Sequence, residues 1–188
     1  MNAHTVDLAR FLVGEIDSVC GAEEVFIKER RLPGGPGKGT VTADDALYFL
    51  ARFRDGALGT FLATRFASGR KNYLRLEIFG SAGSLIFNLE RLNELEYYSR
   101  ADHGTEQGFR TIVVTESSHP YVNLWWPPGH IIGWEHTFIH EIGDLLTAIK
   151  KGQDVQPDFH DGWRCQQVLD AASQSAAEQR WVQVKLEV

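Results

Sequence analysis

The sequence has few of the residues and patterns that would place it in several common protein classes. Its two cysteines, Cys20 and Cys165, lie far apart and outside any CxxC pair, so we expect neither a disulfide framework nor a zinc site. Positive charge is not in excess: the formal net charge is −6, which does not attract a nucleic-acid backbone or an anionic membrane. We therefore predict no nucleic-acid partner and interpret both cysteines as free thiols in a reducing cytoplasm.

Long hydrophobic runs are also missing. Asp7 and Arg10 interrupt the start of the chain, where an export signal needs an unbroken apolar stretch. The longest charge-free run, residues 117–134, contains three prolines and two glycines, which does not suit a membrane helix. The sequence thus predicts a cytoplasmic protein without membrane association.

The chain is rich enough in apolar residues to fold. It has 188 residues, of which 43% are hydrophobic and 23% are charged, and this balance is typical of an ordinary globular domain rather than a disordered segment. Because a single hydrophobic core commonly serves 100 to 200 residues, we expect one domain over residues 1–188.

Alternation of apolar and polar residues predicts strands through the first two thirds of the chain. A hairpin is expected from Asp45 to Phe66 around the turn at Asp55-Gly56. Tight turns then link further expected strands at 72–79, 84–89, 95–98 and 109–115, and others are expected at 19–28 and 182–188. The glycine- and proline-rich segment 30–39 is expected to be a mobile loop.

Helical periodicity appears in three places. Residues 134–151 repeat apolar side chains every three or four positions and are closed by Gly152. A second helix is expected from Asp161, as its N-cap, to about Ser175, and a short one from Thr5 to Val13. These elements predict an α+β fold with a large, mainly antiparallel open sheet and helices packed on one face.

The other sheet face carries apolar side chains that this arrangement leaves uncovered. Tyr48, Leu50, Tyr73 and Phe79 are expected on faces opposite the main apolar sets of their strands. We interpret this face as an interface in a homo-oligomer, and scattered surface aromatics are the alternative.

Glycine-rich segments do not predict a nucleotide site in this chain. Around Lys38 the string GGPGKGT departs from the phosphate-loop pattern, because that pattern requires glycine where Leu32 stands and serine or threonine where Gly39 stands. No GxGxxG follows a strand and opens a helix. We therefore expect no cofactor-binding residues here.

Histidines and aromatic residues gather between residues 119 and 140. His136 and His140 are four apart on one helix, with His130 on the preceding loop, which is a weak pattern for a metal site because the order HExxH is absent. We predict no metal and instead a polar or pocket-facing helix rim. The loop with Trp126 is rigid, aromatic and uncharged, and such walls suit either sugar rings or plain packing. The candidate substrate-binding residues here are Trp126, His130, Trp134 and His136.

Two further clusters carry polar groups that suit substrate chemistry. His4 and Asp7 share one face of the first helix, and a carboxylate near an imidazole supports proton transfer; a simple helix cap is the alternative. Arg70 and Lys71 offer cationic donors between two strands, and a solvated connection is the alternative.

Ordered motifs along nearly the whole chain carry a family resemblance. They are HxxDxxRFLxG from His4, FxDGAxGT from Phe53, IFGSAGSLIF from Ile78, HTFIHEIGDLLTAI from His136, DGW from Asp161 and SAAEQRWVQV from Ser175. This order resembles the C-terminal domain of the Gfo/Idh/MocA oxidoreductases, the family of glucose–fructose oxidoreductase and inositol dehydrogenase. The resemblance implies a substrate-binding and oligomerisation domain that works beside an N-terminal Rossmann domain holding NAD or NADP.

The resemblance also implies roles for particular residues. His4 and Asp7 match the last two positions of the family's DxxxHxxD pattern, whose leading aspartate would fall before Met1. His4 would then be the acid/base group for a sugar or polyol hydroxyl, with Asp7 holding substrate or His4. The family's lysine motif and nucleotide fingerprint are absent, so this chain alone is expected to be inactive, because hydride chemistry belongs to the cofactor.

Three functions remain open. The first is the substrate-binding half of an NAD(P)-dependent sugar, inositol or polyol oxidoreductase. The second is a stand-alone carbohydrate-binding or assembly module without catalysis, and the third is a metal-dependent enzyme built on the histidine cluster.

Overall fold

The computed structural model describes residues 2–185 and has an α+β fold, as predicted. The chain forms two compact units: one contains the residues up to Ser68 together with those from Pro157 onward, and the other contains Gly69–Gln156. All strand pairs of the described residues are antiparallel. The expectation of a single domain over residues 1–188 stays a prediction.

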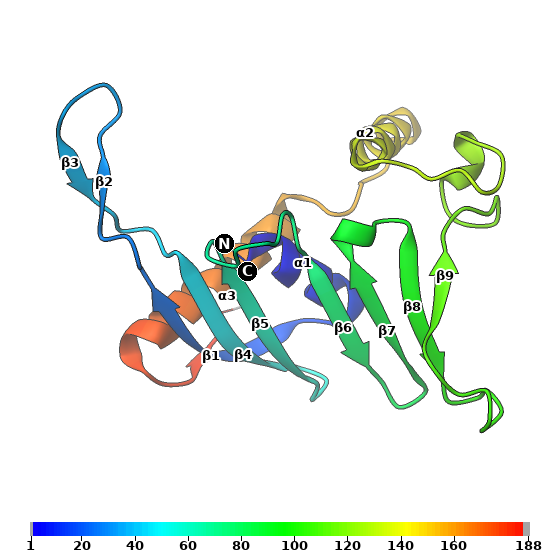
Figure 1. Cartoon of the computed structure of the whole chain (residues 1–188), viewed down its shortest axis with the longest axis horizontal. Coiled ribbons are helices and arrows are strands. Elements are labelled where there is room, and N and C mark those ends of the chain that lie inside the picture. The colour runs from blue at the N-terminus through cyan, green and yellow to red at the C-terminus, as the bar shows by residue number, and fades with distance from the viewer. Residues whose placement is uncertain (1, 186–188) are drawn as a thin grey trace. The chain divides into compact units, whose positions relative to one another are not determined.

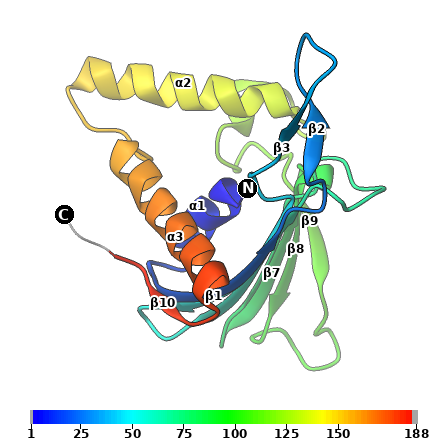
Figure 2. The same cartoon turned by 90° about the vertical axis from the view of Figure 1, so that its left-hand side faces the viewer.

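The first unit is a four-stranded sheet with two helices. Its strands follow the order β10-β1-β4-β5. The strands are β1 (Ile16–Glu24), β4 (Ala46–Phe53), β5 (Leu58–Thr64) and β10 (Val182–Gln183), and the helices are α1 (Ala3–Leu12) and α3 (Phe159–Glu178). Figures 1 and 2 show α1 and α3 on the same face of this sheet.

The core of this unit lies between α3 and the inner sheet face. β4 alternates buried and exposed residues as its sequence predicts, and it contributes Leu47, Phe49, Ala51 and Phe53. Close approach of α3 to β1 depends on Gly21, because a Cβ there would lie 3.1 Å from the Tyr48 oxygen and 3.2 Å from the Ala172 oxygen. The Gly21 N–H donates to Ser175 Oγ at 2.9 Å, so the helix and the strand are also joined by a hydrogen bond.

The expected mobile loop at 30–39 is instead the end of a β-hairpin. β2 (Glu29–Arg31) and β3 (Lys38–Thr40) pair there, and the hairpin projects beyond β1 and β4 (Figure 1). The Leu32 N–H donates to the Gly37 oxygen at 2.9 Å, and the Leu32 side chain lies directly over Gly39. Glycine at that position therefore makes room for pairing, and the expected loop is confined to residues 32–37.

Several element boundaries also differ from the prediction, and two of them have a clear physical reason. β1 begins at Ile16 rather than 19, because Ile16 is fully buried in the core. The N-cap of α3 is Asp158, whose carboxylate accepts from the backbone N–H groups of His160 and Asp161 at 2.7 and 3.1 Å. Asp161 therefore lies inside the helix. At the other end β10 confirms a strand, while Leu186 and Val188 lie outside the described residues.

The second unit is a four-stranded meander followed by an irregular segment and a long helix. Its strands are β6 (Arg75–Phe79), β7 (Gly83–Asn88), β8 (Glu94–Ser99) and β9 (Arg110–Val113), in the order β6-β7-β8-β9. Short 3-10 helices lie at Leu89–Arg91 and Val122–Leu124, and α2 spans Trp134–Lys151. The extent of α2 is confirmed, including its end at Gly152, which has φ 63°.

Helix α2 differs from α3 in its packing. None of its residues is buried, and its apolar side chains are exposed; they include Trp134, Phe138, Ile142, Leu145 and Ile149. The segment before it is anchored by Asn93, whose side chain exchanges hydrogen bonds of 2.8 and 3.0 Å with the Ile132 backbone. Within residues 2–185 no helix has the length and apolar character needed to cross a membrane.

Candidate functional site

His4 and Asp7 lie on α1 in the first unit. Val6 and Ala9 on the same helix are buried, which leaves the His4 side chain exposed and Asp7 half-buried. The His4 imidazole makes no hydrogen bond to any residue between 2 and 185, and Asp7 Oδ1 accepts from the Cys165 thiol at 3.6 Å. The imidazole is therefore available to a ligand, and the carboxylate of Asp7 is oriented from α3.

Arg10 joins α1 to the start of α3. Its side chain is only 7% exposed, and its guanidinium donates to both carboxylate oxygens of Glu15 at 2.7 and 3.2 Å. It also donates to the Asp161 backbone oxygen at 3.0 Å and to Cys165 Sγ at 3.6 Å. The guanidinium lowers the pKa of Glu15, while burial raises the pKa of the Cys165 thiol. This network holds the helix that presents His4.

Arg70 and Lys71 lie in the connection before β6 in the second unit. Glu90 holds this connection, because its carboxylate accepts from the Lys71 N–H at 2.9 Å and pairs with Arg70 at 3.4 Å. A pocket of about 540 Å³, here called the Lys71 pocket, brings Lys71 together with Trp134. Its lining is Gly69, Lys71, Asn72, Leu89, Glu90, Leu92 and Trp134.

Trp126, His130 and His136 lie on the loop before α2 and on its first turn. The Trp126 side chain is 49% exposed, and His130 Nδ1 lies 2.9 Å from the Pro127 oxygen. His136 Nδ1 accepts from the Gly133 N–H at 3.0 Å, so this histidine caps the helix. Neither of the two pockets described here is lined by these three residues.

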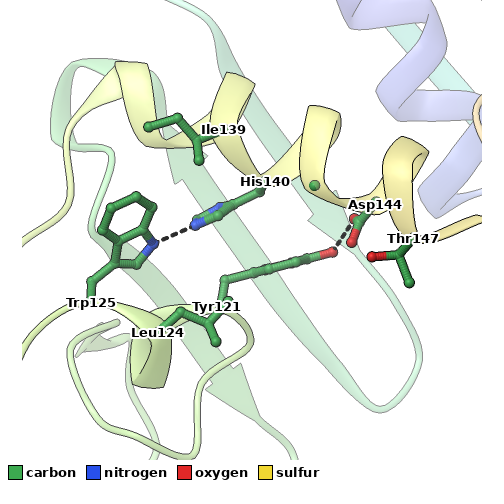
Figure 3. Close-up of a pocket in the computed structure, with 8 residues that line it drawn as sticks. Tyr121, Leu124, Trp125, Ile139, His140, Asp144 and Thr147 are labelled. Atoms are coloured by element: carbon green, nitrogen blue, oxygen red, sulfur yellow. Dashed lines mark hydrogen bonds between the residues drawn. The ribbon is translucent and has the colours of Figure 1, made fainter. Parts of the chain in front are cut away.

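His140 belongs to a second pocket that the sequence analysis missed. Its Nε2 accepts from the Trp125 indole N–H at 2.6 Å, and its ring stacks on Tyr121 with centroids 4.5 Å apart (Figure 3). The Tyr121 hydroxyl donates to Asp144 Oδ2 at 2.7 Å, which raises the pKa of Tyr121. The pocket, of about 270 Å³ and here called the Tyr121 pocket, is lined by Tyr121, Leu124, Trp125, Ile139, His140, Gly143, Asp144 and Thr147.

The contacts of His136 and His140 bear on the metal hypothesis. One nitrogen of each ring is already an acceptor, toward a backbone N–H in His136 and toward an indole in His140. Among the described residues, no three His, Cys, Asp or Glu side chains are grouped to hold a metal ion. These rings shape the helix start and the Tyr121 pocket.

The glycine-rich segment does not have the geometry of a dinucleotide site. Such a cofactor is bound where a strand passes through a glycine-rich turn into a helix whose N–H groups face the pyrophosphate. Here the glycine-rich segment connects β2 with β3, and the Asp158 carboxylate already caps α3. The glycine-rich segment therefore does not have the strand-turn-helix arrangement that binds the pyrophosphate of a dinucleotide.

Comparison with known proteins decides the family. The sequence model of a protein family described as "Oxidoreductase family, C-terminal alpha/beta domain" matches residues 2–184. The chain belongs to the Gfo/Idh/MocA oxidoreductase family. Levoglucosan dehydrogenase from Pseudarthrobacter phenanthrenivorans is 41% identical over 194 residues, which cover 96% of this chain and 50% of that protein.

Solved structures of Gfo/Idh/MocA proteins agree with the fold. An oxidoreductase domain protein from Kribbella flavida has a TM-score of 0.93 and 49% identity over 98% of this chain and 49% of its own. Levoglucosan dehydrogenase in complex with NADH and levoglucosan has a TM-score of 0.92 and 40% identity over 100% of this chain and 50% of its own. This chain therefore spans about half the length of the relatives it matches.

The spacing of residues in the sequence gives a partial signal for the Tyr121 pocket. Tyr121 and Trp125 are four apart, and His140 and Asp144 are four apart on one helix face. What the spacing does not show is that the two pairs meet, because the contact joins segments about 20 residues apart through a turn of irregular backbone.

Proposed function

We propose that this chain is the substrate-binding and oligomer-forming half of an NAD(P)-dependent oxidoreductase acting on a sugar, inositol or related polyol. The supporting observation is its similarity to levoglucosan dehydrogenase, which extends over nearly the whole chain but over only half of that relative. A solved structure of levoglucosan dehydrogenase contains NADH and levoglucosan, which favours the same classes of cofactor and substrate here.

In this proposal His4 is the acid/base group. Oxidation of an alcohol removes a proton from the hydroxyl, and an exposed imidazole without a hydrogen-bond partner among residues 2–185 is suited to accept it. Asp7 contacts the substrate or His4 and is held by the Cys165 thiol. A nicotinamide bound by a nucleotide-binding domain supplies the hydride acceptor.

The proposed substrate contacts in the second unit combine charge with aromatic surface. Arg70 and Lys71 supply donors for hydroxyl oxygens, and Trp134 provides an apolar wall beside Lys71. Trp126, His130 and His136 are the further proposed contacts. By this proposal residues 1–188 bind the substrate but do not oxidise it by themselves.

The first experiment joins this chain to the half of levoglucosan dehydrogenase that it does not match. Mixed with levoglucosan and NAD⁺ or NADP⁺, the unmodified chain is expected to form no reduced nicotinamide, and the fusion is expected to form it. His4→Asn in the fusion is expected to lower kcat/KM by roughly 10²–10⁴-fold, the usual contribution of a general base.

The control substitution is His103→Asn, which changes an exposed histidine whose Nδ1 contacts only Thr105 among the described residues. It is expected to leave kcat/KM unchanged. Equal activity of the His4 and His103 variants would refute the role of His4. Turnover by the unfused chain would refute its assignment as a substrate-binding half.

A further inference from the structure

The Tyr121 pocket has a polar end and an apolar end. Figure 3 shows Asp144 and Thr147 beside the Tyr121 hydroxyl, while Trp125 and Ile139 lie toward the start of α2. Asp144 uses only Oδ2 for Tyr121, so Oδ1 and the Thr147 hydroxyl have no hydrogen bond to any described side chain. The pocket thus offers a carboxylate oxygen and a hydroxyl next to aromatic surface.

The backbone of Tyr121 is held in an unfavourable conformation at this pocket. Its φ is 64°, a left-handed value that non-glycine residues rarely adopt. Such conformations persist where surrounding contacts hold them, and they concentrate at binding sites. Here the contacts are the stacked ring of His140 and the Asp144 carboxylate.

A glycine inside α2 forms part of the pocket lining. Gly143 lies in a helix interior, where glycine is disfavoured relative to alanine. A Cβ at this position would meet no atom within 4 Å, so packing within the described chain does not require glycine. Its absence of a side chain keeps the pocket open between His140 and Asp144.

We propose that the Tyr121 pocket binds one neutral sugar or polyol ring. Its volume of about 270 Å³ lies near the small end of ligand pockets, which suits a single ring. Ring hydroxyls donate to Asp144 Oδ1 and bond to Thr147, while the apolar C–H face of the ligand lies against Trp125 and Ile139. The proposal rests on the proposed function for the choice of sugar and not for the existence of the site.

An organic cation is the competing ligand, and the geometry favours it less. A cation site needs ring faces that surround the charge. One face of the Tyr121 ring is already covered by the His140 ring. The Trp125 ring makes an edge-to-face contact with the His136 ring, with centroids 4.3 Å apart and an angle of 78° between the ring planes, so it is also already in contact with another ring. The Asp144 charge is also partly satisfied by the Tyr121 hydroxyl.

The test titrates the 188-residue chain with levoglucosan, myo-inositol and choline and follows backbone amides by NMR. At millimolar concentrations levoglucosan or myo-inositol is expected to shift amides of residues 121–125 and 139–147. Gly143→Leu fills the pocket and is expected to weaken that binding at least about tenfold, and Asp144→Asn to weaken it by roughly tenfold.

The matched control is Gly162→Leu. Gly162 also lies within a helix, and a Cβ there would meet no atom within 4 Å. Gly162→Leu therefore makes the same glycine-to-leucine change in a helix as Gly143→Leu, but outside the pocket. Circular dichroism of both variants verifies folding. Unchanged sugar affinity in Gly143→Leu, shifts confined to other residues, no shifts with either sugar, or binding of choline alone would overturn the proposal.

This outcome is separable from that of the His4 experiment. A fusion whose activity depends on His4 while Gly143→Leu leaves sugar binding unchanged would reject only the pocket. If Gly143→Leu abolishes sugar binding and the activity of the fusion does not depend on His4, only the proposed catalytic role is rejected.

Discussion

At the scale of single residues, the Arg10 network shows how charge is accommodated inside the first unit. A nearly buried guanidinium is tolerated because both Glu15 oxygens and the Asp161 backbone oxygen accept its protons. The sequence analysis treated Arg10 as a break in an apolar run and as one position of a family motif, and gave it no structural role. Its role depends on Asp161, more than 150 positions away, and that proximity exists only after folding.

Glu15→Gln tests this network through pH. The Arg10 guanidinium lowers the pKa of Glu15, so the stabilisation is complete above the ordinary pKa of glutamate and is lost as pH falls through the lower folded value. We expect Glu15→Gln to cost about 1 kcal/mol of unfolding free energy at neutral pH. The loss of stability of the unmodified chain below about pH 4.5 is expected to be shallower in the variant.

Urea unfolding followed by circular dichroism at several pH values measures both effects. Glu106→Gln is the control, because Glu106 is exposed and has no ion pair within the described chain. The Arg10 interpretation fails if the Glu15 and Glu106 variants show the same dependence on pH as the unmodified chain.

At the scale of elements, α2 and α3 have similar lengths but different surroundings. α3 buries Cys165, Val168, Ala171, Ala172 and Ser175, whereas α2 buries none of its residues. Helices in water are stabilised mostly by tertiary packing of an apolar face. The two helices therefore differ in what holds them folded.

Hydrogen exchange is expected to show this difference. Local opening needs less free energy where few apolar side chains are buried, so amides of α2 should exchange faster than those of α3. A difference of at least about tenfold in protection, roughly 1.4 kcal/mol, is expected between the centres of the helices. Equal protection measured by mass spectrometry would mean that α2 has a covering surface in solution.

The periodicity of the sequence predicted which elements form better than it predicted which elements pack or pair with one another. The β4–β5 hairpin was predictable because an alternating pattern and an Asp-Gly turn are local signals. The β2–β3 pairing was not predictable, because glycine and proline in this segment are typical of a loop. The contact of Leu32 with Gly39 that accompanies the pairing exists only in the folded chain. For the candidate site, His136 and His140 were recognised by spacing, but Tyr121 and Asp144 meet only through the fold.

At the scale of the whole molecule, the outer face of the β10-β1-β4-β5 sheet is the proposed oligomer surface. Tyr48 and Leu50 are each 49% exposed, and Leu62 lies opposite Tyr48 in the sheet register and is 54% exposed. The helices cover the opposite face, so these side chains have no cover within the first unit. Homo-oligomers commonly bury such apolar faces against a second copy.

The double substitution Leu50→Lys and Leu62→Lys places two charges on this face. Burying unpaired charge at an interface costs several kcal/mol, so we expect the oligomer to dissociate to the mass of one chain, 21.1 kDa, in light scattering. Phe159→Lys is the control, because Phe159 is an almost fully exposed apolar residue on α3. If the unmodified chain is already monomeric, or if the double variant keeps its oligomeric mass, the sheet face is not the interface. A control that also dissociates would mean that the interface is not confined to the sheet face and includes the start of α3.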